Sequence, residues 1–443
     1  MPNSVVIKNK IKNFKKIISV SGDKSISIRW VLFSSLASGI SYAKNLLISE
    51  DVLAAINAIK KLGIQSKINK TECKIYGKWI GGYNYKKNIT LDAKNSGTLG
   101  RLILGLLINT PHPIKLIGDK SLSKRDFKRV ADPLTKFGAK IKLNKNKNLP
   151  LIITGSKNLK PCFYNETRGS AQCKSAVIFA GMRTKGTTLI KAKKSRNHTE
   201  LLSKFLKLPI SVKEKKNYDL IKINKVKRIK KLNYLIPSDI SSSAFFIILT
   251  VLSEDSKLII KNVNINLSRI GIITILKKMG VKIKFLNKSI YKGEKKADIE
   301  IQSPRKLKAI NCPPKLNSGA IDEFLVIFLA AAKANGTSYF KNLSELNQKE
   351  SPRLKIAARI LKNMGVKLRY DDNSIKIYGN PNLELKKKIV IKDFLKDHRI
   401  FMMSVISALS FGGEWKIYDP ISVKTSFPSF FKKIREIGGI IKW

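Results

Sequence analysis

The stretch "PSDISSSAFFIILTVLS", residues 237–253, joins a polar start to a long apolar run. Asp239 is a residue type that commonly caps a helix, and proline often stands just outside or at the first position of one. The run that follows contains almost no polar residue, and a helix that is apolar on every side belongs inside a domain. The stretch therefore predicts a capped helix that is buried in a core.

The same pattern recurs along the whole chain. Counting the first stretch, six segments begin with polar residues and continue as an apolar helix: residues 21–39, 94–108, 169–186, 237–253, 317–336 and 396–413. Six others, in which an amphipathic helix ends and a strand begins, alternate with them: residues 56–68, 134–143, 202–212, 273–285, 358–370 and 433–443. In five of these a glycine follows the helix, as is common at this position.

The alternation has a period of about 70–80 residues, which predicts six copies of one unit. Each unit combines a buried helix, an amphipathic helix that covers a sheet, and several short strands. We therefore expect an α/β fold of α+β repeats, in two domains of three units each, with the boundary near Pro237. The first domain would span residues 21–237, and the second would combine residues 1–20 with residues 238–443.

The net charge of +57 is the most conspicuous property of the composition. A nucleic-acid partner is one explanation for such a charge. However, the lysines are scattered through stretches such as "KIKLNKNKNL", and there is no discrete basic tail or RNA-binding motif. Codon bias in an AT-rich genome accounts for abundant Lys, Asn and Ile. We expect no specific nucleic-acid partner and treat arginine as the more informative cation.

The remaining composition favours a protein of the cytoplasm, and we expect it to be a monomer. Its four cysteines, Cys73, Cys162, Cys173 and Cys312, are far apart and include no C-x-x-C pair, so we expect neither a disulfide framework nor a zinc site. The apolar runs are shorter than the roughly 20 residues that span a bilayer. The basic N-terminus has no signal-peptide pattern, and we interpret it as a mature start.

Several polar motifs stand where predicted helices begin. Helix N-termini carry unpaired N–H groups and a partial positive charge, so such loops can collect anions. In "SGDKSISIR", residues 21–29, Lys24, Ser25 and Arg29 either lie on a solvated face or converge on phosphate or carboxylate oxygens. In "KDHR", an acidic cap explains Asp397, whereas Arg399 at the mouth of a buried helix would be costly without a partner.

Two further motifs place charges before helices. "NQKESPR", residues 347–353, is either an ordinary charged loop or a cluster of functional groups. Asp322 and Glu323 precede one of the most apolar helices, where a carboxylate either caps the helix or acts as a base with a raised pKa.

Taken in order, these motifs resemble the signature stretches of the EPSP synthase (3-phosphoshikimate 1-carboxyvinyltransferase) family. The resemblance runs from about residue 20 to the C-terminus and rests on "SGDKSISIR", "NSGTLGR", "GDKSLSKRDF", "GSAQCKSA", "SRNHTE", "PSDISSSAFF", "IDEF", "QKESPRL", "KDHR" and "TSFP". It implies two domains of βαβαββ-like units with a substrate cleft between them. "GSAQCKSA" with "SRNHTE" is most similar to a bacterial subclass often described as glyphosate-tolerant.

The resemblance also implies an activity and the residues that perform it. The family transfers the enolpyruvyl group of phosphoenolpyruvate to the 5-hydroxyl of shikimate 3-phosphate and needs no metal or organic cofactor. Shikimate 3-phosphate would be bound by Lys24, Ser25, Arg29, Ser170, Ala171, Gln172, Ser195, Arg196, Asp322 and Lys349. Phosphoenolpyruvate would be bound by Lys24, Asn95, Gly97, Arg125, Gln172, Arg353, Arg399 and Lys424. Asp322 would be the base, Lys349 and Glu350 a proton-shuttling pair, and Lys24 a further catalytic group.

The chain departs from the family pattern at a few positions. Asn347 replaces an arginine and Pro352 an aspartate, while a lysine that some members carry before the final "FP" pair is Thr425 here, with Lys424 beside it. Some tolerant members carry alanine at the position of Gly97. Because Gly97 is unsubstituted, we expect glyphosate to inhibit in competition with phosphoenolpyruvate.

Two other functions remain open from the residues alone. UDP-N-acetylglucosamine enolpyruvyl transferase shares the chemistry but would carry a reactive cysteine, and only Cys173 lies inside a motif. An RNA-binding or RNA-end-processing protein on a related fold would use the positive charge but would need a nucleophilic histidine. Neither His112 nor His198 has a supporting motif.

Overall fold

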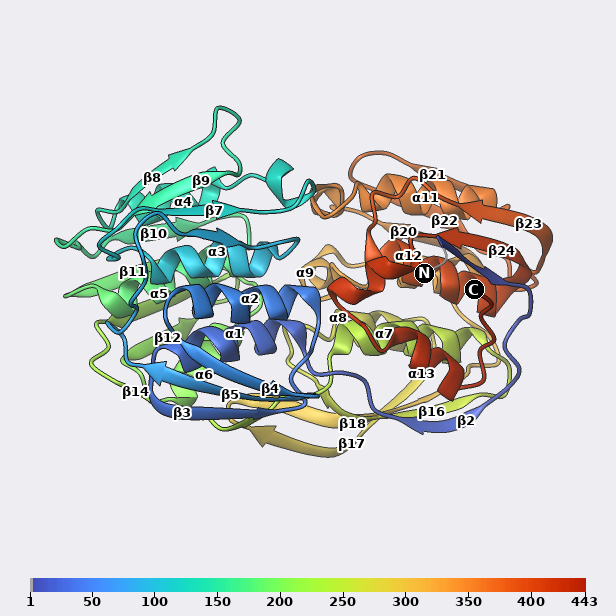
Figure 1. The fold of residues 1–443 in the computed structure, drawn as a ribbon. Coiled ribbons are helices and arrows are strands. Elements are labelled where there is room, and N and C mark those ends of the chain that lie inside the picture. Colours follow the sequence, from blue (N-terminus) through green and yellow to red (C-terminus); the bar gives the residue numbers. More distant parts are fainter. Residues whose placement is uncertain (1–2) are drawn as a thin grey trace. The chain divides into compact units, whose positions relative to one another are not determined.

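The structure is a computed structural model, which describes residues 3–443 (Figure 1). Contacts between residues divide the chain into two compact units. The unit called here the N-terminal unit comprises Gly22–Ile236 and the short segment Tyr291–Glu294. The C-terminal unit comprises the chain up to Ser21 together with Pro237–Ile290 and Lys295–Trp443.

The N-terminal unit alternates helices with short strands. In chain order its elements are α1 (Lys24–Ser35), β3 (Ala37–Lys44), α2 (Glu50–Lys61), β4 (Gln65–Asn69), β5 (Glu72–Lys78), β6 (Thr90–Asp92), α3 (Gly97–Leu106), β7 (Ile114–Ile117), η1 (Leu122–Lys124), α4 (Lys128–Thr135), β8 (Lys140–Leu143), β9 (Leu151–Thr154), β10 (Phe163–Glu166), α5 (Ala171–Arg183), β11 (Thr187–Lys193), α6 (His198–Phe205), β12 (Ile210–Glu214), β13 (Tyr218–Asn224), β14 (Ile229–Lys230) and β15 (Tyr234–Leu235).

The C-terminal unit repeats this alternation. Its elements are β1 (Ser4–Ile7), β2 (Lys15–Ile18), α7 (Ile240–Leu252), β16 (Lys257–Asn264), α8 (Gly271–Lys278), β17 (Lys282–Tyr291), β18 (Glu294–Gln302), β19 (Asn311–Cys312), η2 (Pro314–Leu316), α9 (Asn317–Ala320), α10 (Phe324–Lys333), β20 (Thr337–Phe340), η3 (Ser344–Gln348), α11 (Arg353–Asn363), β21 (Leu368–Tyr370), β22 (Ile375–Tyr378), β23 (Leu385–Ile391), α12 (His398–Phe411), β24 (Gly412–Tyr418), η4 (Pro420–Thr425) and α13 (Phe430–Glu436).

Within the described residues the strands form six small sheets, three in each unit. The strand order is β6-β7-β9-β8 in one sheet, β10-β11-β13-β12 in the next and β19-β20-β22-β21 in a third. In each of these three sheets the first two strands are parallel and the later pairs are antiparallel. The N-terminal stretch provides two strands of the C-terminal unit, because β1 pairs with β24 and β2 pairs with β16.

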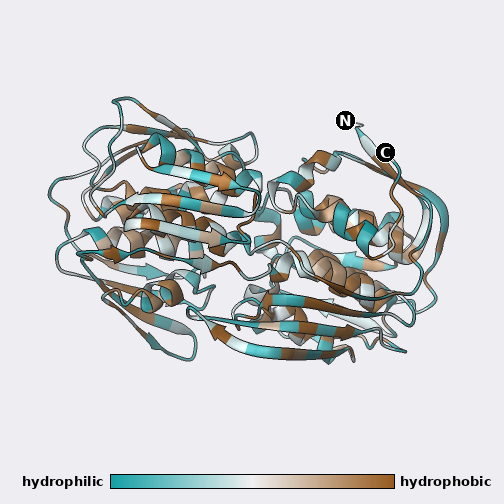
Figure 2. Ribbon diagram, turned by 60° about the horizontal axis from the view of Figure 1, so that its bottom comes forward, coloured by the Kyte–Doolittle hydropathy of each residue, from teal (hydrophilic) through white to brown (hydrophobic). Residues whose placement is uncertain are grey.

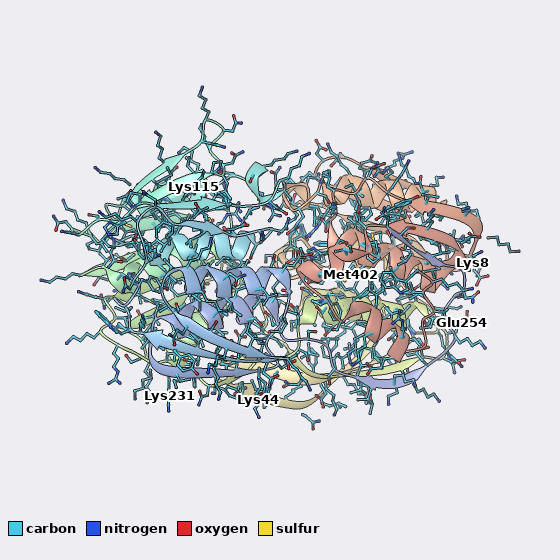
Figure 3. All side chains as sticks on the ribbon, in the orientation of Figure 1. Lys8, Lys44, Lys115, Lys231, Glu254 and Met402 are labelled. Carbon is cyan, nitrogen blue, oxygen red and sulfur yellow. The ribbon has the colours of Figure 1, made fainter. Side chains whose placement is uncertain are left out.

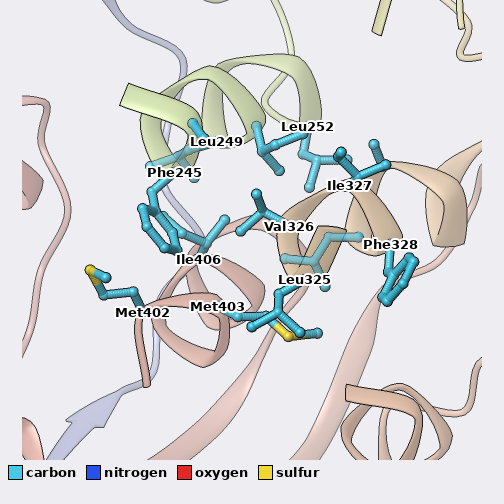
Figure 4. Packing of buried hydrophobic residues seen from close by; sticks show 14 of the residues in the cluster. Phe245, Leu249, Leu252, Leu325, Val326, Ile327, Phe328, Met402, Met403 and Ile406 are labelled. Carbon is cyan, nitrogen blue, oxygen red and sulfur yellow. The ribbon is translucent and has the colours of Figure 1, made fainter. Parts of the chain in front are cut away.

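The predicted apolar helices are confirmed as the core of each unit. Figure 4 shows Phe245 and Leu249 of α7, Leu325 of α10, and Met403 and Ile406 of α12 packed against one another. Helices α1, α3 and α5 are buried along nearly their whole length in the N-terminal unit. Burial of such large apolar side chains is the main stabilising contribution in a domain of this size.

Side-chain caps fix where most of these helices begin. Five residues accept a hydrogen bond from a backbone N–H of the first turn: Asp23, Ser96, Ser170, Asp239 and Asp397. Of the two roles left open for the carboxylates before α10, capping is not observed at Glu323, whose side chain makes no cap hydrogen bond. Its side chain accepts instead from the Ser241 hydroxyl. The capped ends hold the polar motifs in defined loops at the ends of buried helices.

The strands alternate hydrophilic and hydrophobic residues, as Figure 2 shows and as the burial of β11 illustrates. This alternation gives each sheet one core-facing side and one solvent-facing side. Most lysines are solvated, including Lys8, Lys44, Lys115 and Lys231, which are labelled in Figure 3. In the described residues no helix is both long and apolar enough to cross a membrane.

Candidate active site

The first helix of the N-terminal unit begins with a lysine held by a carboxylate. Asp23 is fully buried and its Oδ1 accepts from the backbone N–H of Ile26 at 2.9 Å, which starts α1 at Lys24. Lys24 Nζ donates to Oδ2 of Asp51, in the first turn of α2, at 2.8 Å. The two side chains are 19% and 6% exposed, so Lys24 remains accessible to a ligand while Asp51 is enclosed.

Arg29 extends from the second turn of α1 into a buried hydrogen-bond network. Its Nε donates to Oγ1 of Thr199 at 2.7 Å and its Nη2 to Oγ of Ser175 at 3.1 Å. Burial lowers the pKa of Arg29 to about 10, against the opposing attraction of Glu200 and Asp23. Arg29 is therefore a cation held by neutral hydroxyl partners, an arrangement that leaves charge available for an anion.

A second group of cations surrounds the start of α3. Arg125 Nη2 donates to Oδ1 of Asn95 at 3.2 Å, and Asn95 Nδ2 donates to Asp119 at 2.6 Å. A Cβ at Gly97 would lie 2.9 Å from Nη1 of Arg101 and 3.0 Å from Nη1 of Arg125. The absence of a side chain at Gly97 thus allows two guanidinium groups to approach the helix start.

Helix α5 links the two groups of the N-terminal unit. Its cap, Ser170, accepts from the backbone N–H of Cys173 at 3.3 Å, and Ala171 is the first helical residue. Gln172 Oε1 accepts from Nη1 of Arg101 at 2.7 Å, whereas Ser175, one turn further, accepts from Arg29. Helix α5 therefore contacts both groups, through Ser175 with Arg29 of α1 and through Gln172 with Arg101 of α3.

The loop between β11 and α6 carries Ser195 and Arg196. The hydroxyl of Ser195 is buried and has no hydrogen-bond partner within the described residues 3–443. Arg196 lies close enough to Arg29 to lower the pKa of Arg29 by like-charge repulsion. This loop adds a hydroxyl and a cation to the network.

In the C-terminal unit a buried arginine forms ion pairs with three carboxylates. Arg353 is 1% exposed and opens α11. Its Nε donates to Oδ2 of Asp397 at 2.9 Å, its Nη1 lies 3.4 Å from Oδ1 of Asp322, and its Nη2 donates to Glu350. The planar guanidinium suits several carboxylates at fixed angles. Arg353 therefore positions both predicted acid–base carboxylates, Asp322 and Glu350.

Ionisation in this cluster follows from burial and pairing. Burial alone would raise the pKa of Asp397, but the contact with Arg353 overrides it and the pKa is lowered. Burial would lower the pKa of Arg353, but Asp397, Glu350 and Asp322 raise it above its ordinary value. Both groups are therefore charged at neutral pH.

Asp322 also contacts two further predicted residues. Lys349 Nζ lies 3.8 Å from Oδ1 of Asp322, and Nη1 of Arg399 donates to the Asp322 backbone carbonyl at 2.8 Å. Five of the predicted residues, Asp322, Lys349, Glu350, Arg353 and Arg399, thus lie together in the C-terminal unit. Lys424 differs, because its side chain is exposed on η4.

Several partners of these residues were not singled out from the sequence. They are Asp51, Arg101, Asp119 and Thr199. Nothing in the sequence indicated that Asp397 pairs with Arg353. Arg101 stands inside the quoted motif "NSGTLGR", and its central place in an apolar helix was a signal that could have identified it. The others had no local signal, because their partners lie far away in the chain.

The features required by the two alternative functions lack support here. Cys73, Cys173 and Cys312 are buried, and burial raises the pKa of each of these thiols, which disfavours the reactive thiolate. His198 is 1% exposed and bonded to Glu294, so its ring is not presented as a nucleophile. Among the described residues, no group of three or more His, Cys, Asp or Glu side chains could hold a metal ion.

Comparison with known proteins identifies closely similar chains. A family model described as EPSP synthase (3-phosphoshikimate 1-carboxyvinyltransferase) matches residues 8–434. The 3-phosphoshikimate 1-carboxyvinyltransferase of Ruthia magnifica is 40% identical over 423 residues, covering 95% of both chains. The corresponding protein of Zymomonas mobilis is 37% identical over 425 residues, covering 95% of this chain and 93% of its own.

Solved structures show the same fold. The EPSP synthase of Acinetobacter baumannii matches with a TM-score of 0.88 and 33% identity, covering 100% of this chain and 99% of that chain. The enolpyruvyl transferase NikO from Streptomyces tendae matches with a TM-score of 0.79, 14% identity and coverage of 100% and 99%, which is a likeness of fold alone. The predicted fold class, α/β repeats in two domains, is confirmed.

Proposed function

The chain belongs to the EPSP synthase (3-phosphoshikimate 1-carboxyvinyltransferase) family, and we propose that its polar clusters divide substrate binding and proton transfer between them. It is a transferase of the shikimate pathway, which supplies aromatic amino acids. The reaction moves the enolpyruvyl group of phosphoenolpyruvate to the 5-hydroxyl of shikimate 3-phosphate and releases phosphate.

Shikimate 3-phosphate is assigned mainly to the network of the N-terminal unit. Its ligands are Lys24, Ser25, Arg29, Ser170, Ala171, Gln172, Ser195 and Arg196, with Asp322 and Lys349 from the C-terminal unit. Two facts support the assignment. Lys24 and Arg29 supply positive charge for a phosphate, and the buried Ser195 hydroxyl is available for a hydrogen bond.

Phosphoenolpyruvate is assigned to a second set of residues, which shares Lys24 and Gln172 with the first. Its ligands are Lys24, Asn95, Gly97, Arg125, Gln172, Arg353, Arg399 and Lys424. Arginine forms paired hydrogen bonds with both carboxylate and phosphate, and phosphoenolpyruvate carries one of each. The approach of Arg125 and Arg101 to Gly97 supports this assignment, while the exposed Lys424 makes the weakest contribution to it.

The chemistry proceeds by addition and elimination. The Asp322 carboxylate accepts the proton of the 5-hydroxyl, whose oxygen bonds to the phosphate-bearing carbon, while Lys349 with Glu350 protonates the methylene carbon. In the second step Lys349 with Glu350 takes a proton back from the new methyl group, the double bond re-forms, and the carbon–oxygen bond to phosphate breaks with its electron pair on phosphate. The observation that carries this proposal is Arg353, which contacts both Asp322 and Glu350.

Finer assignments rest on the motifs and the composition. The motifs "GSAQCKSA" and "SRNHTE" support membership of the bacterial subclass often described as glyphosate-tolerant. We propose domain boundaries at residues 21–237 and at residues 1–20 with 238–443, apart from the hairpin tip Tyr291–Glu294, which groups with the first domain. We also propose a cytoplasmic monomer that has no specific nucleic-acid partner. Any association with RNA is then non-specific and falls steeply as salt is raised.

The proposal is tested by phosphate release from shikimate 3-phosphate plus phosphoenolpyruvate. Wild-type protein is expected to release phosphate only when both substrates are present. Lys24→Ala and Asp322→Ala are each expected to lose at least about 100-fold in kcat/KM, since general acid–base groups contribute roughly that much or more. Full activity of Asp322→Ala would remove it as the base, and UDP-N-acetylglucosamine as the preferred acceptor would contradict the substrate assignment.

A further inference from the structure

The start of α6 is fixed by partners from several elements. His198, Thr199 and Glu200 directly follow the loop of Ser195 and Arg196. Thr199 accepts from Arg29 of α1, and Glu200 forms a 2.7 Å ion pair with Lys174 of α5, whose side chain is completely buried. Three successive anchors at this point indicate that the loop before α6 must be held accurately.

The third anchor comes from a distant part of the chain. Nδ1 of His198 lies 2.6 Å from Oε1 of Glu294, and the two residues are 1% and 3% exposed. Glu294 stands at the tip of the β17–β18 hairpin, 96 positions away from His198 in the sequence. A buried carboxylate is costly unless it is paired, so this contact is a specific feature of the fold.

The hairpin tip is built to reach α6. Gly293 has a φ of +87°, a conformation that favours glycine, and a Cβ there would lie 2.9 Å from the carbonyl oxygen of Leu201 in α6. Tyr291 accepts from the backbone N–H of Leu235 at 3.0 Å, and Lys292 donates to the carbonyl of Asn233. Through these contacts the tip, Tyr291–Glu294, belongs to the N-terminal unit, although the rest of strands β17 and β18 belongs to the C-terminal unit.

Glu294 also acts on the electrostatics of the network. Together with Glu200 and Asp23 it opposes the lowering of the Arg29 pKa that burial causes. Arg196 acts on Arg29 in the opposite sense. The carboxylate of Glu294 therefore lies near enough to Arg29, one of the cations assigned to the phosphate of shikimate 3-phosphate, to oppose the lowering of its pKa.

We propose that Glu294 is a positioning residue for shikimate 3-phosphate: by holding His198 at the start of α6, it orients the loop that presents Ser195 and Arg196. This inference rests on the proposed function of that loop. Glu294 does not touch the substrate, so its removal leaves every direct ligand in the chain. We expect the affinity for shikimate 3-phosphate to fall and the affinity for phosphoenolpyruvate to stay the same.

The test compares three substitutions of Glu294 with a matched control. Glu294→Ala removes the anchor, and Glu294→Asp shortens it by one methylene. Glu294→Gln retains an oxygen at the same place to accept from His198. Glu300→Ala is the control, because Glu300 is another glutamate of β18 and its 2.8 Å ion pair with Lys257 lies within the C-terminal unit. Initial rates give KM for each substrate separately, calorimetry gives the Kd of shikimate 3-phosphate, and thermal unfolding reports folding.

Glu294→Ala is expected to raise KM and Kd for shikimate 3-phosphate by about tenfold or more, since small misplacements of binding groups are costly. KM for phosphoenolpyruvate should stay within about twofold, Glu294→Gln should restore most of the affinity, and Glu300→Ala should behave as wild type. If the alanine variant does not fold, Glu294→Asp is expected to raise KM for shikimate 3-phosphate while KM for phosphoenolpyruvate stays unchanged.

Two results would overturn the inference in a variant that folds. One is an unchanged KM for shikimate 3-phosphate, and the other is an equal rise in KM for both substrates, which indicates a merely structural role. A glutamine variant as weak as the alanine variant would also count against a positioning hydrogen bond. A wild-type protein that is inactive with both substrates would instead refute the proposed function, so the two failures are distinguishable.

Discussion

Gly97→Ala is expected to weaken phosphoenolpyruvate binding through two guanidinium groups. The new Cβ would lie 2.9 Å from Nη1 of Arg101 and 3.0 Å from Nη1 of Arg125. Non-bonded carbon and nitrogen atoms in van der Waals contact are separated by roughly 3.5 Å or more. The ends of both arginine side chains must therefore move away by about half an ångström. These are ends of flexible side chains, and the helix backbone therefore need not move.

The expected magnitude follows from this displacement. A misplacement of 1 Å at a binding group costs about 100-fold, so half of that distance is expected to raise KM for phosphoenolpyruvate about tenfold. Gly97 is the first residue of α3 and does not have a positive φ, so alanine fits the backbone there and the variant should unfold at about the same temperature as wild type. The functional loss should therefore not come from a loss of stability.

Initial rates of phosphate release, with one substrate varied at a time, measure the effect. Gly100→Ala on the same helix is the matched control, since the nearest neighbours of its Cβ would be the Phe127 ring at 3.2 Å and the Ala93 methyl group at 3.5 Å. An unchanged KM for phosphoenolpyruvate in Gly97→Ala would refute the reasoning, as would an equal rise in Gly100→Ala.

Two further predictions concern inhibition and pH. Glyphosate is expected to inhibit the wild type in competition with phosphoenolpyruvate and to inhibit Gly97→Ala less strongly; turnover unaffected by millimolar glyphosate at low phosphoenolpyruvate would contradict this. Asp397→Asn keeps the helix cap but leaves Arg353 without its closest buried charge partner, and loss of such a partner costs about 3–5 kcal/mol of unfolding free energy. Because the pKa of Asp397 is lowered in the fold, this stabilisation is present above its ordinary value near 3.8 and is lost as pH falls through the lower folded value. The difference between wild type and variant in urea unfolding should therefore be full at pH 7 and shrink below pH 4, whereas a pH-independent difference would argue against the ion pair.

The buried helices could be predicted because their signals are local. Caps such as Asp239 and Asp397 bond to N–H groups two residues away, and the apolar run that follows is visible without any partner. The six-fold alternation of helix types then predicts the repeat architecture, since each unit needs the same two helix faces. The role of Glu323 could not be decided in this way, because its carboxylate accepts from the Ser241 hydroxyl, 82 positions away.

The buried helices, the repeat and the family to which the motifs belong could therefore be predicted from the amino-acid sequence alone. Which charged groups meet depends on the tertiary packing. Arg353 pairs with Asp397 across 44 positions, Arg29 with Thr199 across 170, and His198 with Glu294 across 96. Such pairs depend on how sheets and helices pack, and no periodicity in the chain encodes them. For the same reason Glu294, which carried no signal in the sequence, becomes a candidate positioning residue only once the hairpin tip is placed against α6.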